Sequence, residues 1–230
     1  MTVLALVGSP LLGPAMWRST AVALEREGAR TVVVPAAPEA PQHPEDVVEH
    51  LVGRLAGLRR VVVVVHSNAG LFVPVLTHRL PGIAAALLVD AALPPAGGRA
   101  TLAPPGMLPV LRGMADDHGL LPPWTRWWPE DEVSALFPDP AARSAVEAGQ
   151  PRLPVDYFAA DLPVPEGWTA HPAAYLRFSE AYVDEQERAV SWGWPVATVP
   201  GNHLHPLAEP DATAAALLAL LRRLDPSLVG

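Results

Sequence analysis

The sequence contains no cysteine and no lysine. Without cysteine, the chain can form no disulfide bond, thiolate nucleophile or cysteine-bound metal site. Without lysine, it can form no Schiff base with a carbonyl substrate and lacks the lysine of a phosphate-binding loop. All 16 basic residues are therefore arginine, and the formal net charge is −8. This acidic balance argues against binding to nucleic acid or to an anionic membrane surface.

Long apolar segments are missing as well. No apolar run approaches the roughly 20 residues that a transmembrane helix needs. The stretch from Met1 to Gly8 is largely apolar, but it lacks a basic start, and Gly8 and Pro10 interrupt it early. We therefore interpret it as a strand rather than a signal peptide, and we predict a cytoplasmic protein.

Signals for a metal or a cofactor are also absent from the sequence. No glycine-rich phosphate or dinucleotide fingerprint follows the first expected strand. Most of the histidines are scattered without the spacing of metal ligands, and these are His43, His50, His78, His118 and His171. We expect neither a metal nor a cofactor.

A regular alternation of strands and helices occupies much of the chain. Its 230 residues are 50% hydrophobic, which allows a sizeable core, and we predict one domain over residues 1–230. The pattern indicates an α/β fold with a mostly parallel sheet flanked by helices. The expected strands are Thr2–Val7, Thr31–Val34, Val61–Val65, Ile83–Val89, Ala174–Phe178 and Pro195–Val199. The expected helices are Ala15–Glu27, Glu45–Leu58, Ala69 to near Pro81, Asp184–Ser191 and Asp211–Leu224, with a proline-rich loop before Pro44.

Residues 91–169 interrupt this alternation. The segment is dense in proline, contains several tryptophans and has no pattern typical of a buried strand. Short helices are expected over Asp131–Leu136 and Pro140–Ala148. A long irregular insertion is either functional or disordered, and the tryptophan content argues against disorder. We therefore predict a helical lid.

The stretch Arg60–Gly70 is the one around which the chain is organised. Five consecutive valines, with no polar alternation, predict a central strand that is covered on both faces. The strand runs directly into Ser67 and an expected helix. Such a turn is a nucleophile elbow, which presents the hydroxyl above the sheet at a helix N-terminus that favours negative charge. The elbow requires small residues on both sides; Ala69 meets this requirement, whereas Val65 does not.

A candidate general base follows the last expected strand. His203 lies in the short loop Gly201-Asn202-His203, from which an imidazole can reach back over Ser67. His205 is an alternative, but it lies where the chain already turns into the next helix.

A candidate carboxylate follows the strand next to the central one. Asp90 ends that buried strand, where it can orient a histidine and stabilise its protonated form. Glu180 and Asp184, which follow the next strand, are alternatives.

The loop after the first strand is a candidate for binding a developing oxyanion. This task needs two backbone N–H groups. One is expected from Asn68, directly after the serine, and the other from Ser9 or Leu11, because Pro10 has no N–H.

These residues together give the chain a resemblance to the α/β-hydrolase superfamily, in a small form that is similar to its thioesterase-type branch. The resemblance implies a Ser67–His203–Asp90 triad and a covalent acyl-enzyme. Val65 in a small position, and Val7 where histidine is common, depart from the family pattern. A cyclase, lyase, epimerase or non-catalytic binding protein on the same fold is therefore kept as an alternative.

The tryptophan-rich part of the insertion suggests a substrate pocket. Trp124, Trp127 and Trp128 can line an apolar cleft, or they can fill a small core of the lid itself. The expected function is a serine hydrolase acting on an ester or thioester of an apolar acyl group. The expected partner is a small-molecule acyl substrate, free or carried on another molecule. The oligomeric state is left open.

Overall fold

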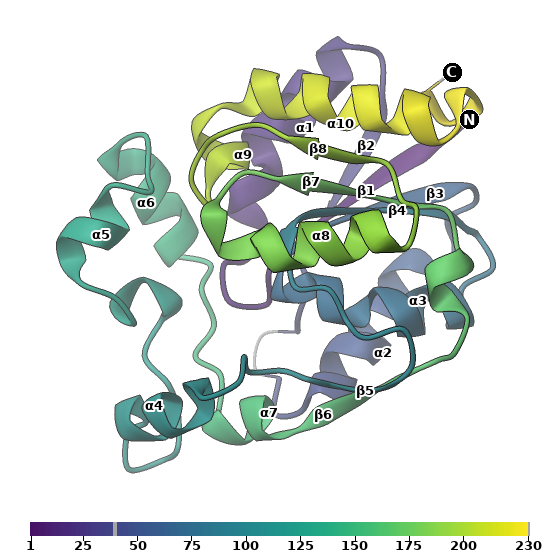
Figure 1. Cartoon of the computed structure of the whole chain (residues 1–230). Helices are drawn as coiled ribbons and strands as arrows, with labels where there is room; N and C mark the ends of the chain where they lie inside the picture. Colours follow the sequence, from purple (N-terminus) through teal and green to yellow (C-terminus); the bar gives the residue numbers. More distant parts are fainter. Residues whose placement is uncertain (39–40, 230) are drawn as a thin grey trace.

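A computed structural model describes residues 1–38 and 41–229. Six parallel strands form one sheet in the order β2-β1-β3-β4-β7-β8, with helices on both faces (Figure 1). This confirms the predicted α/β fold with a mostly parallel sheet. The proline-rich loop expected before Pro44 includes Glu39 and Ala40, which lie outside the described residues.

The strands and helices lie close to their expected positions outside the insertion. The strands of the main sheet are β1 (Val3–Val7), β2 (Arg30–Val34), β3 (Val61–Ser67), β4 (Ile83–Ala91), β7 (Ala173–Arg177) and β8 (Val196–Thr198). The flanking helices are α1 (Arg18–Arg26), α2 (Pro44–Leu55), α3 (Val73–Arg79), α8 (Val183–Ser191), α9 (His205–Ala208) and α10 (Pro210–Leu224). Short 3₁₀ helices precede α1, α3 and α8, namely η1 (Pro14–Trp17), η2 (Asn68–Phe72) and η5 (Glu180–Tyr182).

The valine run of β3 lies at the centre of the sheet and is buried on both sides. Val61, Val63 and Val65 belong to the core formed with α2 and α3. Val62 and Val64 belong to the opposite core, formed with α1 and α10. Alternation along a strand sends successive side chains to opposite faces. The continuous run is therefore the pattern that a two-sided sheet requires.

The insertion contains more regular structure than expected. Its helices are α4 (Met107–Met114), α5 (Glu130–Ser134), α6 (Pro140–Glu147) and α7 (Val155–Ala159). Two strands, β5 (Gly98–Thr101) and β6 (Asp161–Val164), pair antiparallel into a separate ribbon. The sequence gives no pattern typical of a buried strand here, and these two strands are indeed only partly buried. Each strand is only four residues long and partly exposed, so its sequence lacks the continuous apolar run that marks the central strands.

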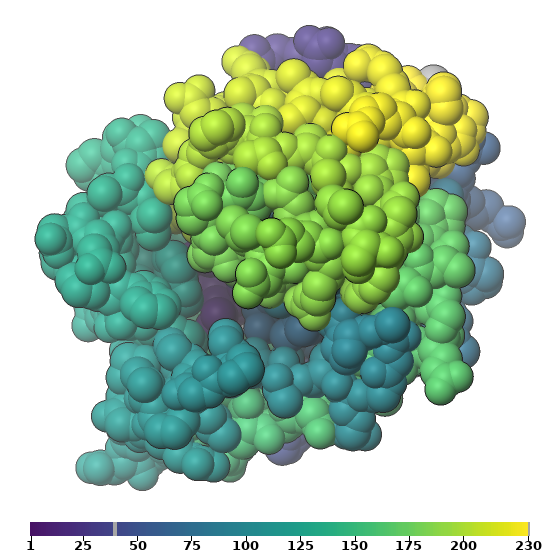
Figure 2. Space-filling view, viewed as in Figure 1, coloured from purple at the N-terminus to yellow at the C-terminus, as the bar shows by residue number. Residues whose placement is uncertain are grey.

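The insertion lies beyond the ends of the central strands, beside η5 and α8. Figure 1 shows α4, α5 and α6 on one side of the sheet and the β5–β6 ribbon below it. In the space-filling view, a hollow opens between the insertion and α8 (Figure 2). In open parallel sheets, ligands bind beyond the carboxyl ends of the strands. Within the described part of the chain, no helix combines the length and apolar character needed to cross a membrane.

The chain turns sharply at the end of β3. Ser67 has φ 57° and ψ −131°, a strained backbone conformation for a residue other than glycine. Val65, which takes the place of the small residue in the elbow pattern, is fully buried in the same core as Ala69 and Phe72. The turn adopts its strained conformation with this larger side chain in place. Gly70 provides the space for a close approach, since an added Cβ would lie 2.1 Å from the backbone oxygen of Ala92.

Replacement of Gly70 by alanine is expected to destabilise the fold. The new methyl group would meet backbone rather than a flexible side chain, and overpacking of this kind costs about 1–3 kcal/mol. The free energy of unfolding, measured by urea denaturation, reports the loss.

The matched control is Gly53→Ala in α2, where an added Cβ meets nothing within 4 Å. Because alanine is the better helix former, this variant should gain about 0.5–1 kcal/mol. Equal stability of the two variants would mean that the approach of Gly70 to Ala92 is not tight.

Candidate active site

Two strained residues end neighbouring strands at the carboxyl edge of the sheet. Ser67 follows the valines of β3, and Asp90, at the end of β4, has a positive φ of 43°. Pairing between the two strands skips Asp90 and resumes between Ser67 and Ala91. The backbone N–H of Ala92 then donates to the Ser67 carbonyl at 3.0 Å. Strain of this kind clusters at functional sites because the surrounding structure must hold it in place.

Asp90 binds two segments that are distant in sequence. Its Oδ2 lies 2.8 Å from His203 Nδ1 and accepts a hydrogen bond from the Ser179 hydroxyl at 2.7 Å. Its Oδ1 accepts from the backbone N–H groups of Phe178 and Ser179, at 2.9 and 3.0 Å. Complete burial by itself raises the pKa of the carboxyl, but the hydrogen bonds from His203 and Ser179 outweigh it, and the net pKa is lowered. The carboxylate is thus charged, buried and fully paired.

The other carboxylates considered from the sequence lie elsewhere. Glu180 is exposed and forms an ion pair with Arg177 at 2.7 Å. Asp184 is exposed on α8. Within the part of the chain that the structure describes, the only carboxylate paired with His203 is that of Asp90.

His205 is held away from the position that His203 occupies. Its ring packs against Phe178, with the ring centroids 4.5 Å apart. It also lies so close to Gly201 that a Cβ there would be 2.3 Å from its Nδ1. Gly201 therefore leaves room for His205 to pack beneath the loop, while His203 faces the cavity.

Aromatic rings surround the His203 ring. His66 lies 4.3 Å away between ring centroids, and its Nε2 donates to the His203 carbonyl at 2.8 Å. Tyr182 stacks on His203 at 5.3 Å with an interplanar angle of 15°, and Trp124 lies at 6.2 Å. Burial, followed by the nearby His203, lowers the pKa of His66 to about 3. His66 is therefore neutral, and it fixes the backbone of His203 without competing for protons.

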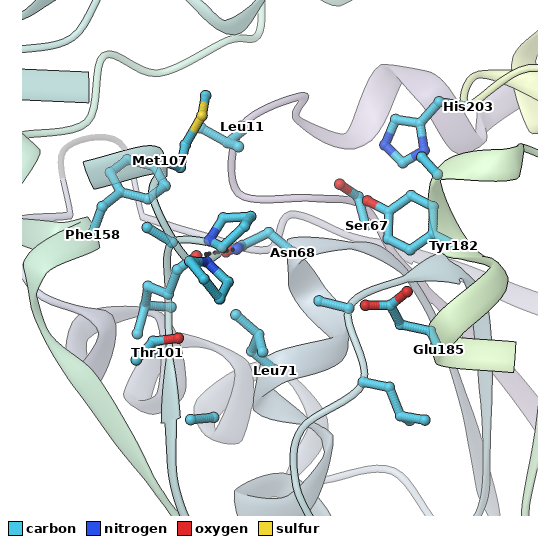
Figure 3. A pocket seen from close by; sticks show the side chains of 18 of the residues that line it. Leu11, Ser67, Asn68, Leu71, Thr101, Met107, Phe158, Tyr182, Glu185 and His203 are labelled. Carbon is cyan, nitrogen blue, oxygen red and sulfur yellow. Dashed lines mark hydrogen bonds between the residues drawn. The ribbon is translucent and has the colours of Figure 1, made fainter. Parts of the chain in front are cut away.

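Ser67 faces this group of residues. Figure 3 shows Ser67, His203 and Tyr182 directed toward one another at the edge of the cavity. The Tyr182 hydroxyl lies beside the Ser67 side chain (Figure 3). Among the hydrogen bonds of the described residues, none joins Ser67 directly to His203. Apo structures often show long distances between such groups.

Sequence reasoning missed Tyr182, His66 and Ser179. All three act through contacts that form only on folding: a ring stack, a hydrogen bond to a backbone carbonyl and a hydrogen bond to Asp90. Their one signal in the sequence was position, since His66 precedes Ser67 and the other two follow the strand after Asp90. Position alone assigns no role.

The loop after β1 is tightly packed, and its residue Leu11 lines the same cavity as Ser67. Ser9 is fully buried, and its Oγ accepts a hydrogen bond from the Leu11 N–H at 3.2 Å. An added Cβ on Gly8 would lie 2.6 Å from the Gly13 oxygen, so the loop has no room for a larger residue there. The Leu11 N–H is thus already engaged, and its side chain lines the cavity. Two N–H groups of this loop were expected as oxyanion donors, those of Ser9 and Leu11. Because the Leu11 N–H is bonded to Ser9 Oγ, the Ser9 N–H is the better candidate.

A cavity of about 760 Å³ opens from Ser67 into the insertion. Its walls are mostly leucine, alanine, proline and aromatic side chains, and they include Trp124, Trp127 and Trp128. Trp127 donates from its indole nitrogen to the Pro122 carbonyl at 2.8 Å, while Trp128 is 43% exposed. Leu71, Thr101, Met107 and Phe158 extend the cavity away from His203 (Figure 3). The volume is typical of a small-molecule site.

Charged groups lie at the edge of the cavity that α8 forms. Glu185 and Arg188 line it and lie 3.5 Å apart. Burial raises the pKa of Glu185. No three histidine, aspartate or glutamate side chains in residues 1–38 and 41–229 group as ligands for a metal ion.

The sequence matches no family model and no curated protein. Its structure, however, resembles many solved ones. One is an extracellular α/β-hydrolase from a Paenibacillus species, described as sharing structural and functional homology with tobacco salicylic acid binding protein 2. The TM-score is 0.76 at 17% identity, over 96% of this chain and 98% of the other.

Two further structures extend the comparison. A pyrethroid hydrolase from Sphingobium faniae JZ-2 matches with a TM-score of 0.71 at 16% identity, over 98% of this chain and 99% of the other. A variant of tomato methylketone synthase I, complexed with β-ketoheptanoate, matches with a TM-score of 0.62 at 11% identity, over 97% and 99%. The six-stranded parallel sheet and these likenesses across nearly the whole length establish that the chain has the α/β-hydrolase fold.

Proposed function

We propose that the protein is a serine hydrolase that cleaves an ester or thioester of an apolar acyl group. The observation that carries this proposal is the buried Asp90 carboxylate, 2.8 Å from Nδ1 of His203, together with the cavity that both His203 and Ser67 line. A carboxylate, an imidazole and a serine on a strained turn, placed in this order, are the components of nucleophilic acyl transfer.

Each residue of the triad has a separate task. Asp90 accepts a hydrogen bond from His203 Nδ1–H, which leaves Nε2 free to take the proton of Ser67. Ser67 then attacks the carbonyl carbon and forms a covalent acyl-enzyme. His203 first returns the proton to the leaving group and then activates water for deacylation. The Asp90 charge stabilises the protonated imidazole in both steps.

The oxyanion and the acyl group are assigned to different parts of the site. The backbone N–H groups of Asn68 and Ser9 are proposed to bind the oxyanion, with the Leu11 N–H excluded by its bond to Ser9 Oγ. The apolar walls of the cavity, including Trp124 and Trp127, suit an apolar acyl group.

Ser67 is expected to react with an active-site-directed fluorophosphonate. Ser67→Ala should abolish the labelling and lower ester hydrolysis by at least about 10³-fold, because it removes the nucleophile. Mass spectrometry of the labelled protein identifies the modified residue. Ser191→Ala, at an exposed serine of α8, is the control and should label like the wild type. Labelling at any other residue would contradict the triad.

Asp90→Asn is expected to lower kcat by about 10³- to 10⁴-fold, because an amide cannot hold the imidazole in its productive tautomer or stabilise its charge. Asp184→Asn and Glu180→Gln are matched controls, since both remove an exposed carboxylate after the next strand. These two should retain activity within about twofold. A greater loss in either control than in Asp90→Asn would assign the acid elsewhere.

The same variant carries a test of stability against pH. The folded pKa of Asp90 lies below its usual value of 3.8. Its contribution to stability is therefore present above that value and is lost as the pH falls through the lower folded pKa. As the pH falls below 3.8, the wild type should therefore lose more free energy of unfolding than Asp90→Asn.

A second candidate is a non-hydrolytic reaction on the same fold. Two observations favour its consideration: the structural likeness to methylketone synthase I, and the Tyr182 hydroxyl that is directed at Ser67. In that reaction His203 would move a proton without an acyl-enzyme. Turnover of a native substrate that survives Ser67→Ala but not His203→Ala would select this candidate.

A further inference from the structure

We propose that Tyr182 is a further catalytic residue, whose hydroxyl donates a hydrogen bond to the leaving-group oxygen, and that the substrate is therefore an oxygen ester of an alcohol rather than a thioester. This inference rests on the proposed function and narrows its substrate class. It assigns a task to a residue that forms part of the cavity wall beside the nucleophile.

The position of Tyr182 is fixed by its contacts. Its ring stacks nearly parallel on His203, 5.3 Å between centroids. Figure 3 shows its hydroxyl directed at Ser67. Tyr182 is also the last residue of η5 and the N-cap of α8, so its backbone is held between two helical segments. The hydroxyl is thus directed at Ser67, while the ring that carries it lies against the imidazole of His203.

The leaving group must occupy the same place. His203 can return the proton only to an oxygen that lies within reach of its Nε2. The tetrahedral intermediate is bonded to Ser67, and its oxyanion lies on the opposite side, toward Asn68 and Ser9. The leaving oxygen therefore lies near Ser67, His203 and the Tyr182 hydroxyl. Burial raises the pKa of Tyr182, so the phenol keeps its proton and can donate.

The proton balance leaves Tyr182 unchanged over the cycle. Ser67 transfers its proton to His203 as the bond between Oγ and the acyl carbon forms. When the bond from the acyl carbon to the leaving oxygen breaks, that proton passes from His203 to the oxygen and an alcohol departs. Water then gives a proton to His203, attacks the acyl carbon and displaces Ser67, which regains the proton. Tyr182 only donates a hydrogen bond while the leaving oxygen bears negative charge.

This donor matters most for a poor leaving group. An alkoxide concentrates negative charge on one oxygen and accepts a strong hydrogen bond. A p-nitrophenolate disperses its charge over the ring, and a thiolate sulfur is a weaker acceptor than oxygen. A hydroxyl held at this position therefore accelerates alkyl esters more than aryl esters or thioesters.

Tyr182→Phe tests the inference, because it removes the hydroxyl and keeps a ring that can stack on His203. The probes share one acyl group: ethyl butanoate, p-nitrophenyl butanoate and a butanoyl thioester. The measured quantity is kcat/KM, which reports acylation. The loss on the ethyl ester should exceed the loss on the other two by roughly 10- to 100-fold.

The control is Tyr157→Phe, which also removes a buried tyrosine hydroxyl. That hydroxyl has no hydrogen-bond partner within the described chain. This variant should keep the wild-type ratio between the three substrates. In the wild type itself, kcat/KM should fall only shallowly as the leaving group becomes more basic, a measurement that does not depend on how the variant folds.

The outcomes separate this inference from the proposed function. An equal loss on all three substrates would mean that Tyr182 only positions Ser67 or His203, and it would overturn the inference. So would a wild type that hydrolyses the thioester but not the ethyl ester, although the proposed function would stand. If the wild type hydrolyses none of the probes and Ser67 resists fluorophosphonate, the proposed function fails and the inference fails with it.

Discussion

The buried Asp90 carboxylate is the group that connects the separate segments of the candidate site. One oxygen binds the backbone after β7, and the other binds Ser179 and His203. A charge in the interior is stable only when it is fully paired, and an unpaired one is costly. The loop after β7 and the loop after β8 are therefore both held in place by the need to pair this charge. The same loops carry Tyr182 and His203. The arrangement of these two residues around Ser67 therefore depends on the pairing of Asp90.

The fold could be predicted from the sequence wherever burial left a regular pattern. The valines of β3 are continuous because helices cover both faces, and that pattern cannot be confused with a half-exposed strand. The β5–β6 ribbon could not be found in the same way. Only some of its side chains are buried, and what defines it is pairing between segments about sixty residues apart in sequence. Local sequence carries little information about such a pairing.

The candidate site divides in a similar way. Ser67, Asp90 and His203 could be placed from chain order, because each follows a strand whose carboxyl end reaches the same edge of the sheet. The sequence favoured Asp90 but left Glu180 and Asp184, which follow the next strand, as alternatives, because it does not show which carboxylate is buried and directed toward His203. Tyr182 could not be predicted at all. Its role depends on a stack against a ring 21 positions away in sequence, and no local pattern encodes that contact.

The insertion is hydrogen-bonded to the segments that hold Ser67 and His203. The Asn68 side chain donates to the Leu102 carbonyl at 3.1 Å, which links the wall after β5 to the residue that follows Ser67. The Asn202 side chain donates to the Leu136 carbonyl at 3.3 Å, which ties the segment after α5 to the residue preceding His203. The insertion also supplies most of the apolar wall of the cavity. The two amides therefore connect the wall of the cavity to the neighbours of Ser67 and His203. The segment that shapes the cavity is thus also linked to the residues beside Ser67 and His203. This link matters because a displacement on the order of 1 Å between reacting atoms costs roughly 100-fold in rate.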